Sequence, residues 1–257
     1  MMFVPYVCCG DPNLEFSYQL IKKLAPYSTI IELGIPFSDP IADGKTIQMA
    51  ANRALKNGVT VEKIFAMIKL LRKEGIKTPF VFMTYYNIVY SYGKEKFLER
   101  ITTSSVQGII IPDLPFEEDP EFENLAEKHG IGIVKLIAPN TEEKRAKKIL
   151  TNEKLFTYLV STTGTTGAKR EIGNESLDFV KRIRKLAGND KKLYVGFGIS
   201  NAAQAKEIVN AGADGVIIGS RIIDIYSKFI GTDGEMTIGA IEQVEKFVKE
   251  IKGAEND

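Results

Sequence analysis

The chain has 257 residues, with 34 Lys and Arg against 33 Asp and Glu, one His and two Cys. A net charge of +1 gives no overall attraction to nucleic acid or anionic lipid, and 44% hydrophobic with 26% charged residues is ordinary for a globular protein. No apolar run approaches the ~20 residues of a membrane-spanning helix, and residues 1–5 lack the basic start of a secretion signal, so we expect a cytoplasmic protein.

Short apolar segments recur along the chain, and stretches with helical spacing separate them. The expected strands are residues 3–8, 29–33, 80–84, 108–111, 132–136, 155–161, 193–197 and 214–218. Their nearly continuous apolar character is typical of strands buried on both faces of a parallel sheet. Between the second and third of them, Val61, Ile64, Phe65 and Ile68 form one stripe, which predicts a helix.

Eight strands alternating with helices, with no linker-like segment, predict an α/β fold: a single (β/α)8 barrel of the TIM type over residues 1–257. A doubly wound open sheet is the alternative, although it usually has fewer strands or a second domain. Active sites of such barrels lie at the carboxyl ends of the strands and in the loops that follow. The residues directly after each strand are therefore the candidates for chemistry.

The chain is poor in metal-ligating side chains. Cys8 and Cys9 are adjacent and point to opposite faces of a strand, so we interpret them as small buried hydrophobic residues. His129 precedes Gly130 in a pattern typical of the last turn of a helix, where a cation is favourable. We expect no metal site and no disulfide, and acid–base chemistry falls to carboxylates, Tyr, Lys or Cys.

Glu32 is a carboxylate inside an otherwise apolar strand, and the alternation points it into the barrel. A buried carboxylate normally has either a salt-bridge partner, such as Lys135, or a function, and its place at the carboxyl end of the strand favours function. Burial is expected to raise its pKa toward the range useful for proton transfer. Asp39 and Asp43 follow in the next loop, although turn formation or helix N-capping would also explain either of them.

The last three strands end in glycine-rich loops at residues 164–168, 196–200 and 219–220, and a short helix is expected at residues 221–228. Each loop alone is weak evidence, but together they match the phosphate site that barrels form from the loops after strands seven and eight and an extra helix. Backbone N–H groups bind the anion there.

Several aromatic and apolar side chains stand near strand ends at positions that can face inward. They are Tyr6, Met83, Tyr85 and Tyr158. Core layers would explain all four, but beside an acid pair and a phosphate site they indicate a substrate with an aromatic or apolar part.

Residues 32–44, ELGIPFSDPIADG, resemble the signature of the tryptophan synthase α subunit family. Five further segments match the family in the same order along the chain. They are FVPY at residues 3–6, GDP at 10–12, MTYYN at 83–87, PDLP at 112–115 and GFGIS at 196–200. The resemblance runs from Phe3 to the C-terminal helix and agrees with the barrel expected from the strand pattern.

The resemblance implies retro-aldol cleavage of indole-3-glycerol phosphate to indole and glyceraldehyde 3-phosphate, with no cofactor in this chain. By position, Glu32 matches the main acid–base residue and Asp43 the acceptor of the indole N–H bond. Thr166 matches the threonine that orients this Asp. The remaining matches are substrate-contacting positions: Tyr6, Met83, Tyr85, Tyr158, Phe197, and the phosphate binders Gly167, Gly198, Gly219 and Ser220.

The family works as an α2β2 complex with a β subunit that uses pyridoxal phosphate and receives indole, so the same partner is expected here. Asp39, Pro40 and residues 164–168 match loops that close on the substrate and face the partner. Asn87, Asp113 and Pro115 match other interface positions.

Three features depart from the family pattern. Lys45 stands where Pro is commonest and Thr165 where Val is frequent, and only Met1 and Met2 precede the first strand, where the family usually has a helix. None of these replaces a proton-transfer group.

Other functions remain as alternatives. One is a free-standing lyase that releases indole, and another is a phosphate-binding isomerase or epimerase, which does not explain residues 32–44. A third is a barrel that has no catalytic activity and binds a β-like partner. The presence of both candidate carboxylates, Glu32 and Asp43, argues against this third alternative.

Overall fold

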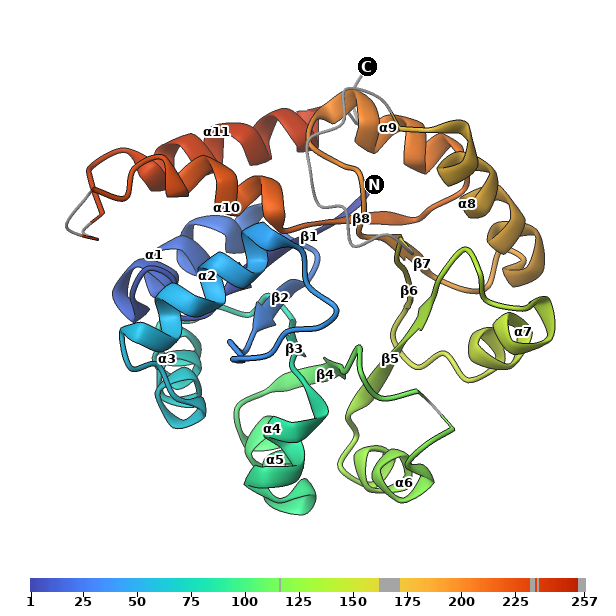
Figure 1. The fold of residues 1–257 in the computed structure, drawn as a ribbon, viewed down its shortest axis with the longest axis horizontal. Helices are drawn as coiled ribbons and strands as arrows, with labels where there is room; N and C mark the ends of the chain where they lie inside the picture. Colours follow the sequence, from blue (N-terminus) through green and yellow to red (C-terminus); the bar gives the residue numbers. More distant parts are fainter. Residues whose placement is uncertain (116, 162–171, 232–233, 235, 254–257) are drawn as a thin grey trace.

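The computed structural model describes residues 1–115, 117–161, 172–231, 234 and 236–253. In this part of the chain eight parallel strands close into a barrel, each pairing with the next and β8 with β1 (Figure 1). The strands are β1 (Met2–Cys8), β2 (Ile31–Gly34), β3 (Phe80–Met83), β4 (Val106–Ile110), β5 (Gly132–Ile137), β6 (Thr157–Leu159), β7 (Leu193–Val195) and β8 (Gly215–Ile218). The predicted barrel is confirmed, although β6 and β7 are shorter than the apolar runs that predicted them.

Helices ring the barrel, with one or two between successive strands and two after β8 (Figure 1). They are α1 (Leu14–Leu24), the 3-10 helix η1 (Ala25–Tyr27), α2 (Lys45–Lys56), α3 (Val61–Lys73), α4 (Tyr86–Tyr92), α5 (Lys94–Thr103), α6 (Pro120–Lys128), α7 (Glu143–Thr151), α8 (Asn174–Ala187), α9 (Ala202–Asn210), α10 (Ser220–Ser227) and α11 (Ala240–Gly253).

Local sequence explains where several helices begin. The side chains of Asn13, Thr60, Asp119 and Asn201 each accept a hydrogen bond from a backbone N–H in the first turn of the helix that follows. Such N-caps satisfy donors that have no partner within the helix. In α3 the predicted apolar stripe is confirmed, because its inner residues are buried against the barrel.

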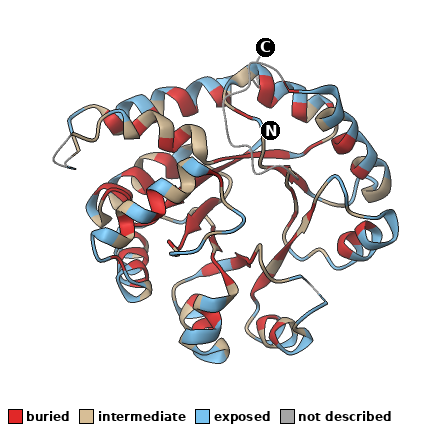
Figure 2. Ribbon diagram, in the orientation of Figure 1, coloured by how far each residue is buried: buried red, intermediate tan, exposed pale blue. Residues whose placement is uncertain are grey.

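Most residues of the strands are buried (Figure 2). Their side chains alternate between the inside and the outside of the barrel, and both layers form buried clusters. The interior cluster consists of Val4, Val81, Ile110, Val134, Phe156, Tyr194 and Ile217. The rings of Phe156 and Tyr194 stack with their centroids 4.5 Å apart. The interior is thus a packed core and leaves room for a ligand only at the ends of the strands.

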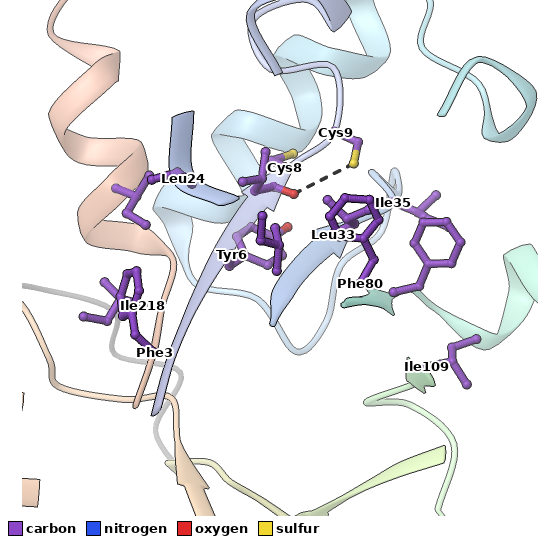
Figure 3. Close-up of a cluster of buried hydrophobic side chains, with 14 of the residues drawn as sticks. Phe3, Tyr6, Cys8, Cys9, Leu24, Leu33, Ile35, Phe80, Ile109 and Ile218 are labelled. Atoms are coloured by element: carbon purple, nitrogen blue, oxygen red, sulfur yellow. Dashed lines mark hydrogen bonds between the residues drawn. The ribbon is translucent and has the colours of Figure 1, made fainter. Parts of the chain in front are cut away.

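The outer layer packs the strands against the helices. Figure 3 shows part of it, with Phe3, Leu24 and Phe80 among its fully buried side chains. Cys8 and Cys9 belong to the same cluster, and both are buried free thiols, which confirms their interpretation as small hydrophobic residues. Burial raises the pKa of both thiols.

Lys135 and His129, two residues discussed from the sequence, both lie beside a glutamate in the structure. Lys135 forms an ion pair with Glu123 of α6, at 2.9 Å from Nζ to Oε1. His129 follows the last residue of α6, and Gly130 adopts a φ of 69°, as predicted for the end of a helix. The His129 Nε2 atom lies 3.5 Å from Glu95.

Two glycines leave room for one leucine near the amino ends of the strands. A Cβ atom on Gly108 would lie 2.3 Å from Leu155 and 2.7 Å from the carbonyl oxygen of Gly132. The three atoms nearest to a Cβ on Gly132 all belong to the Leu155 side chain, the first at 2.6 Å. A side chain can rotate away, whereas a carbonyl in a paired strand cannot, so Gly108 is the more restricted position.

We predict that Gly108→Ala lowers the free energy of unfolding by about 1–3 kcal/mol, because overpacking forces the paired strands apart. Gly132→Ala is expected to cost less. Gly253→Ala is the control, because nothing lies within 4 Å of its Cβ position. Urea unfolding measures all three, and equal losses for Gly108→Ala and Gly253→Ala would contradict the packing argument.

Candidate active site

A cavity of about 360 Å³ opens at the carboxyl ends of the strands. This volume is within the range of small-molecule sites. Nine of the residues predicted from the sequence line it: Tyr6, Glu32, Asp43, Met83, Tyr158, Phe197, Gly198, Gly219 and Ser220. The barrel therefore brings together side chains that are far apart in the sequence.

Glu32 is buried in this cavity, and no ion pair to it is found among the described residues. Its side chain belongs to β2, opposite Tyr6 of β1 and Val81 of β3 in the strand register, and the residue is 1% exposed. Within the described part of the chain, its Oε2 atom accepts no hydrogen bond. Burial, and then the nearby charge of Asp43, raises the pKa of Glu32 to about 8. The carboxyl group is therefore mostly protonated at neutral pH.

Asp43 comes from the loop between β2 and α2. The N-cap position of α2 is Gly44, so N-capping does not explain Asp43. The Tyr85 hydroxyl donates to Asp43 Oδ2 at 3.1 Å and accepts from the Ala42 N–H at 3.0 Å. Gln48 Nε2 donates to the Asp43 carbonyl oxygen at 2.8 Å. Both the carboxylate and the backbone of Asp43 are thereby held in place.

The surroundings of Asp43 give it a lower pKa than Glu32. Burial raises the pKa of Asp43 to about 6, and the hydrogen bond from Tyr85 partly opposes this increase. At neutral pH Asp43 is mostly ionised while Glu32 is mostly protonated. The site thus holds one acid and one base at the same pH.

Tyr85 reaches the site through Asp43. Tyr85 is not one of the described residues that line the cavity. Its ring stacks on Phe37, with 5.0 Å between the ring centroids. Its predicted contact with a substrate stays a prediction. The structure places its hydroxyl against the Asp43 carboxylate. Asp39 of the same loop is exposed and accepts a hydrogen bond from Ser38 at 2.6 Å.

Two tyrosines fit over glycines on neighbouring strands. A Cβ on Gly34 would lie 2.1 Å from the Tyr6 hydroxyl oxygen, and a Cβ on Gly196 would lie 2.3 Å from the Tyr158 ring. Burial raises the pKa of both tyrosines well above the usual value, and the charges of Glu32 and Asp43 add to this increase. Both hydroxyls therefore stay neutral in the cavity wall.

The part of the cavity wall at the start of α10 has the features of an anion site. Gly219 holds the N-cap position of α10 without a side-chain cap, and Ile223 is the first residue whose N–H bonds back to the Gly219 carbonyl. The N–H groups before it have no partner within the helix, and the helix dipole favours negative charge there. Gly198 adopts a φ of 70°, which suits glycine. Thr166 and Gly167 lie outside the described residues.

Sequence reasoning missed other lining residues. Examples are Ile110, Pro112, Leu136, Arg221 and Asp224. Period-two alternation from Val134 would have placed Leu136 inside the barrel, and Asp224 is one helical turn after Ser220.

The described part of the chain contains no group of three or more His, Cys, Asp or Glu residues arranged to hold a metal ion. None of its helices is long and apolar enough to cross a membrane.

Comparison with known proteins agrees with this geometry. The model of the family "Tryptophan synthase alpha chain" matches residues 1–255. The tryptophan synthase alpha chain of Methanococcus vannielii is 44% identical over 250 residues, which cover 97% of this chain and 93% of that protein.

Solved structures agree as well. A chain of the tryptophan synthase complex from Pyrococcus furiosus superposes with a TM-score of 0.87 at 38% identity, covering 98% of both chains. A second structure, which describes mutual activation in the α2β2 complex of the same organism, gives a TM-score of 0.88 at 38% identity and the same coverage. With a full-length family match and relatives above 40% identity, the chain belongs to the tryptophan synthase alpha chain family.

Proposed function

We propose that this chain cleaves indole-3-glycerol phosphate to indole and glyceraldehyde 3-phosphate in tryptophan biosynthesis, as a carbon–carbon lyase. Membership of the family supports the reaction. The observation that carries the residue roles is the pair of carboxyl groups in one cavity, Glu32 with a pKa of about 8 and Asp43 with a pKa of about 6. The same cavity is lined by the start of α10, which is suited to a phosphate.

Glu32 serves as both acid and base in the proposed reaction. Its protonated carboxyl group gives a proton to C3 of the indole ring, which leaves a positive charge shared with the ring nitrogen. The bond from C3 to the side chain then breaks, and its electron pair restores the aromatic ring. The hydroxyl on the departing carbon loses its proton to the Glu32 carboxylate and becomes the aldehyde. Glu32 ends the cycle protonated, as it began.

Asp43 stabilises the intermediate charge. Its carboxylate accepts a hydrogen bond from the indole N–H, and this bond strengthens when C3 is protonated and the nitrogen becomes positive. The hydroxyl of Tyr85 holds the carboxylate for this contact. Tyr6, Met83, Tyr158 and Phe197 supply the aromatic and apolar wall for the ring.

The phosphate binds at Gly198, Gly219 and Ser220, where backbone N–H groups and the start of α10 face the cavity. Thr166 and Gly167 of the preceding loop complete the proposed site. The mechanism uses proton transfer alone and needs no metal or organic cofactor in this chain.

We also propose that the chain acts as one domain, in an α2β2 complex with a β subunit that carries pyridoxal phosphate and receives the indole. The support is the α2β2 complex of the P. furiosus relative. Of the proposed interface residues, Asn87 lies in the first turn of α4, and Asp113 accepts the backbone N–H of Tyr86 at 2.9 Å. A cytoplasmic location stays a prediction.

We predict that Glu32→Gln lowers kcat for indole release by about 10²- to 10⁴-fold, because the amide cannot give or accept the proton. Binding of an uncleavable indole propyl phosphate should change only a few-fold, since the shape of the side chain is kept. Glu99→Gln, on the exposed face of α5, is the matched control. Indole release is measured with and without a β subunit.

Each assignment has its own contrary result in this assay. No indole from the wild-type chain under either condition would overturn the lyase, and full turnover by Glu32→Gln would overturn the role of Glu32. Equal turnover with and without the β subunit would favour a free-standing lyase.

The pH dependence of kcat/KM follows from the two carboxyl groups. We predict a bell-shaped profile that rises through about pH 6 as Asp43 ionises and falls through about pH 8 as Glu32 loses its proton. Initial rates at saturating β subunit and low substrate measure it. A profile that is flat between pH 5 and 9, as rough limits, would contradict these roles.

The stability of the folded chain should also depend on pH, through the carboxyl group of Glu32. The pKa of Glu32 is about 8 in the folded chain, above its ordinary value of 4.5, so the folded state keeps a proton that the unfolded state releases. Stability from this group is therefore full below pH 4.5 and is lost as the pH rises toward 8. We predict that Glu32→Gln gains on the order of 5 kcal/mol relative to wild type across this interval.

Urea unfolding of both chains from acid to alkaline pH measures this gain. Glu99→Gln is again the control, and its difference from wild type should be constant. Parallel curves for Glu32→Gln and wild type would show that Glu32 is not held protonated.

A further inference from the structure

Outside the cavity, one buried polar cluster is not explained by the proposed chemistry. The side chain of Asp11, which follows β1, is fully buried. Arg53 donates to it from Nε at 2.7 Å and from Nη2 at 2.8 Å, and the Tyr226 hydroxyl donates to Oδ2 at 2.6 Å. Arg53 Nη2 also donates to Ser227 Oγ at 3.2 Å. We call Asp11, Arg53, Tyr226 and Ser227 the Asp11 network.

The Asp11 network joins two helices that lie side by side, α2 and α10 (Figure 1). Arg53 belongs to α2, and Tyr226 and Ser227 belong to α10. A second polar contact links the same helices nearer the cavity, where Thr46 Oγ1 donates to Asp224 Oδ1 at 3.2 Å. The two helices are thus connected at both the first turn and the third turn of α2.

These helices carry the two ends of the proposed site. Asp43 stands two residues before the start of α2, and Ser220 is the first residue of α10. Any shift of α2 along α10 therefore changes the separation between the carboxylate and the phosphate-binding N–H groups.

The Asp11 network is suited to holding α2 at one position along α10. A bidentate Arg–carboxylate pair is directional, and a buried carboxylate that loses a partner is costly, so sliding is opposed more strongly than it would be by apolar side chains alone. Burial, followed by the charge of Asp11, raises the pKa of Tyr226 well above its usual value, so the hydroxyl remains a donor.

We propose that the Asp11 network and the Thr46–Asp224 bond set the distance between Asp43 and the phosphate-binding end of α10, and so match the cavity to the length of its substrate. This rests on the proposed function, in which indole N–H and phosphate are the two ends of one molecule. Two subsites held at the correct spacing bind a linked ligand far better than its separate parts. Arg53, Tyr226 and Thr46 are therefore positioning residues.

The test compares a linked ligand with its fragments. The full-length chain is titrated with indole propyl phosphate, with indole and with inorganic phosphate, using wild type, Tyr226→Phe, Thr46→Val and the double variant. We expect the double variant to bind the linked ligand about tenfold more weakly, while its affinity for each fragment changes less than about twofold. With the true substrate and a β subunit, KM should rise more than kcat falls.

Tyr27→Phe is the matched control. It removes a tyrosine hydroxyl that bonds Glu245 at 2.7 Å, between η1 and α11 and away from the cavity. This variant should lose thermal stability without changing the ratio of linked to fragment affinity. A loss of stability alone is therefore not expected to change the ratio of linked to fragment affinity.

Contrary outcomes separate the two levels of the argument. If the linked and fragment affinities of the double variant fall in proportion, or neither changes, the positioning role is overturned while the lyase stands. If wild type gains nothing from linking the fragments, both are overturned. Should the double variant fail to fold, Thr46→Val alone decides, because its hydroxyl is only partly buried and the substitution keeps the side-chain shape.

Discussion

The proposed chemistry depends on a carboxyl group that the fold buries at the end of a strand. Glu32 lies inside the barrel with one oxygen that lacks a hydrogen-bond partner among the described residues, and burial and the charge of Asp43 raise its pKa. A paired glutamate would be ionised at neutral pH and unable to give a proton. The unfavourable burial is therefore what makes Glu32 an acid, and the stability that it costs is lost for the sake of function.

The second carboxyl group works because its surroundings differ. Asp43 stands on a loop, receives a hydrogen bond from Tyr85 and has a pKa about two units below that of Glu32. The mutual repulsion of two nearby carboxylates further favours keeping one of them protonated. A barrel supplies these two environments naturally, because strand ends are enclosed while the loops that follow them are partly exposed.

Sequence reasoning recovered the barrel and nine residues of the cavity wall for a physical reason. The period-two alternation places Tyr6, Glu32 and Tyr158 inside, and parallel strands carry their ends to the same face. It could not distinguish Tyr85, whose hydroxyl meets Asp43, from a residue of the cavity wall, because both are aromatic residues near a strand end. The partners of Lys135 and Asp11 were equally hidden, since they come from helices whose rotation about their axes is set by packing.

Glycines at the strand ends show how the chemistry and the fold constrain one another. Gly34 and Gly196 have no other role visible in the sequence than to end a strand, yet each leaves the space that a tyrosine ring from a neighbouring strand occupies. Both rings line the cavity that holds Glu32, whose burial raises its pKa. An alanine at either glycine would displace a ring before it touched a substrate. The surroundings of Glu32 thus depend on the absence of a methyl group at Gly34, two residues further along β2, and at Gly196, directly after β7.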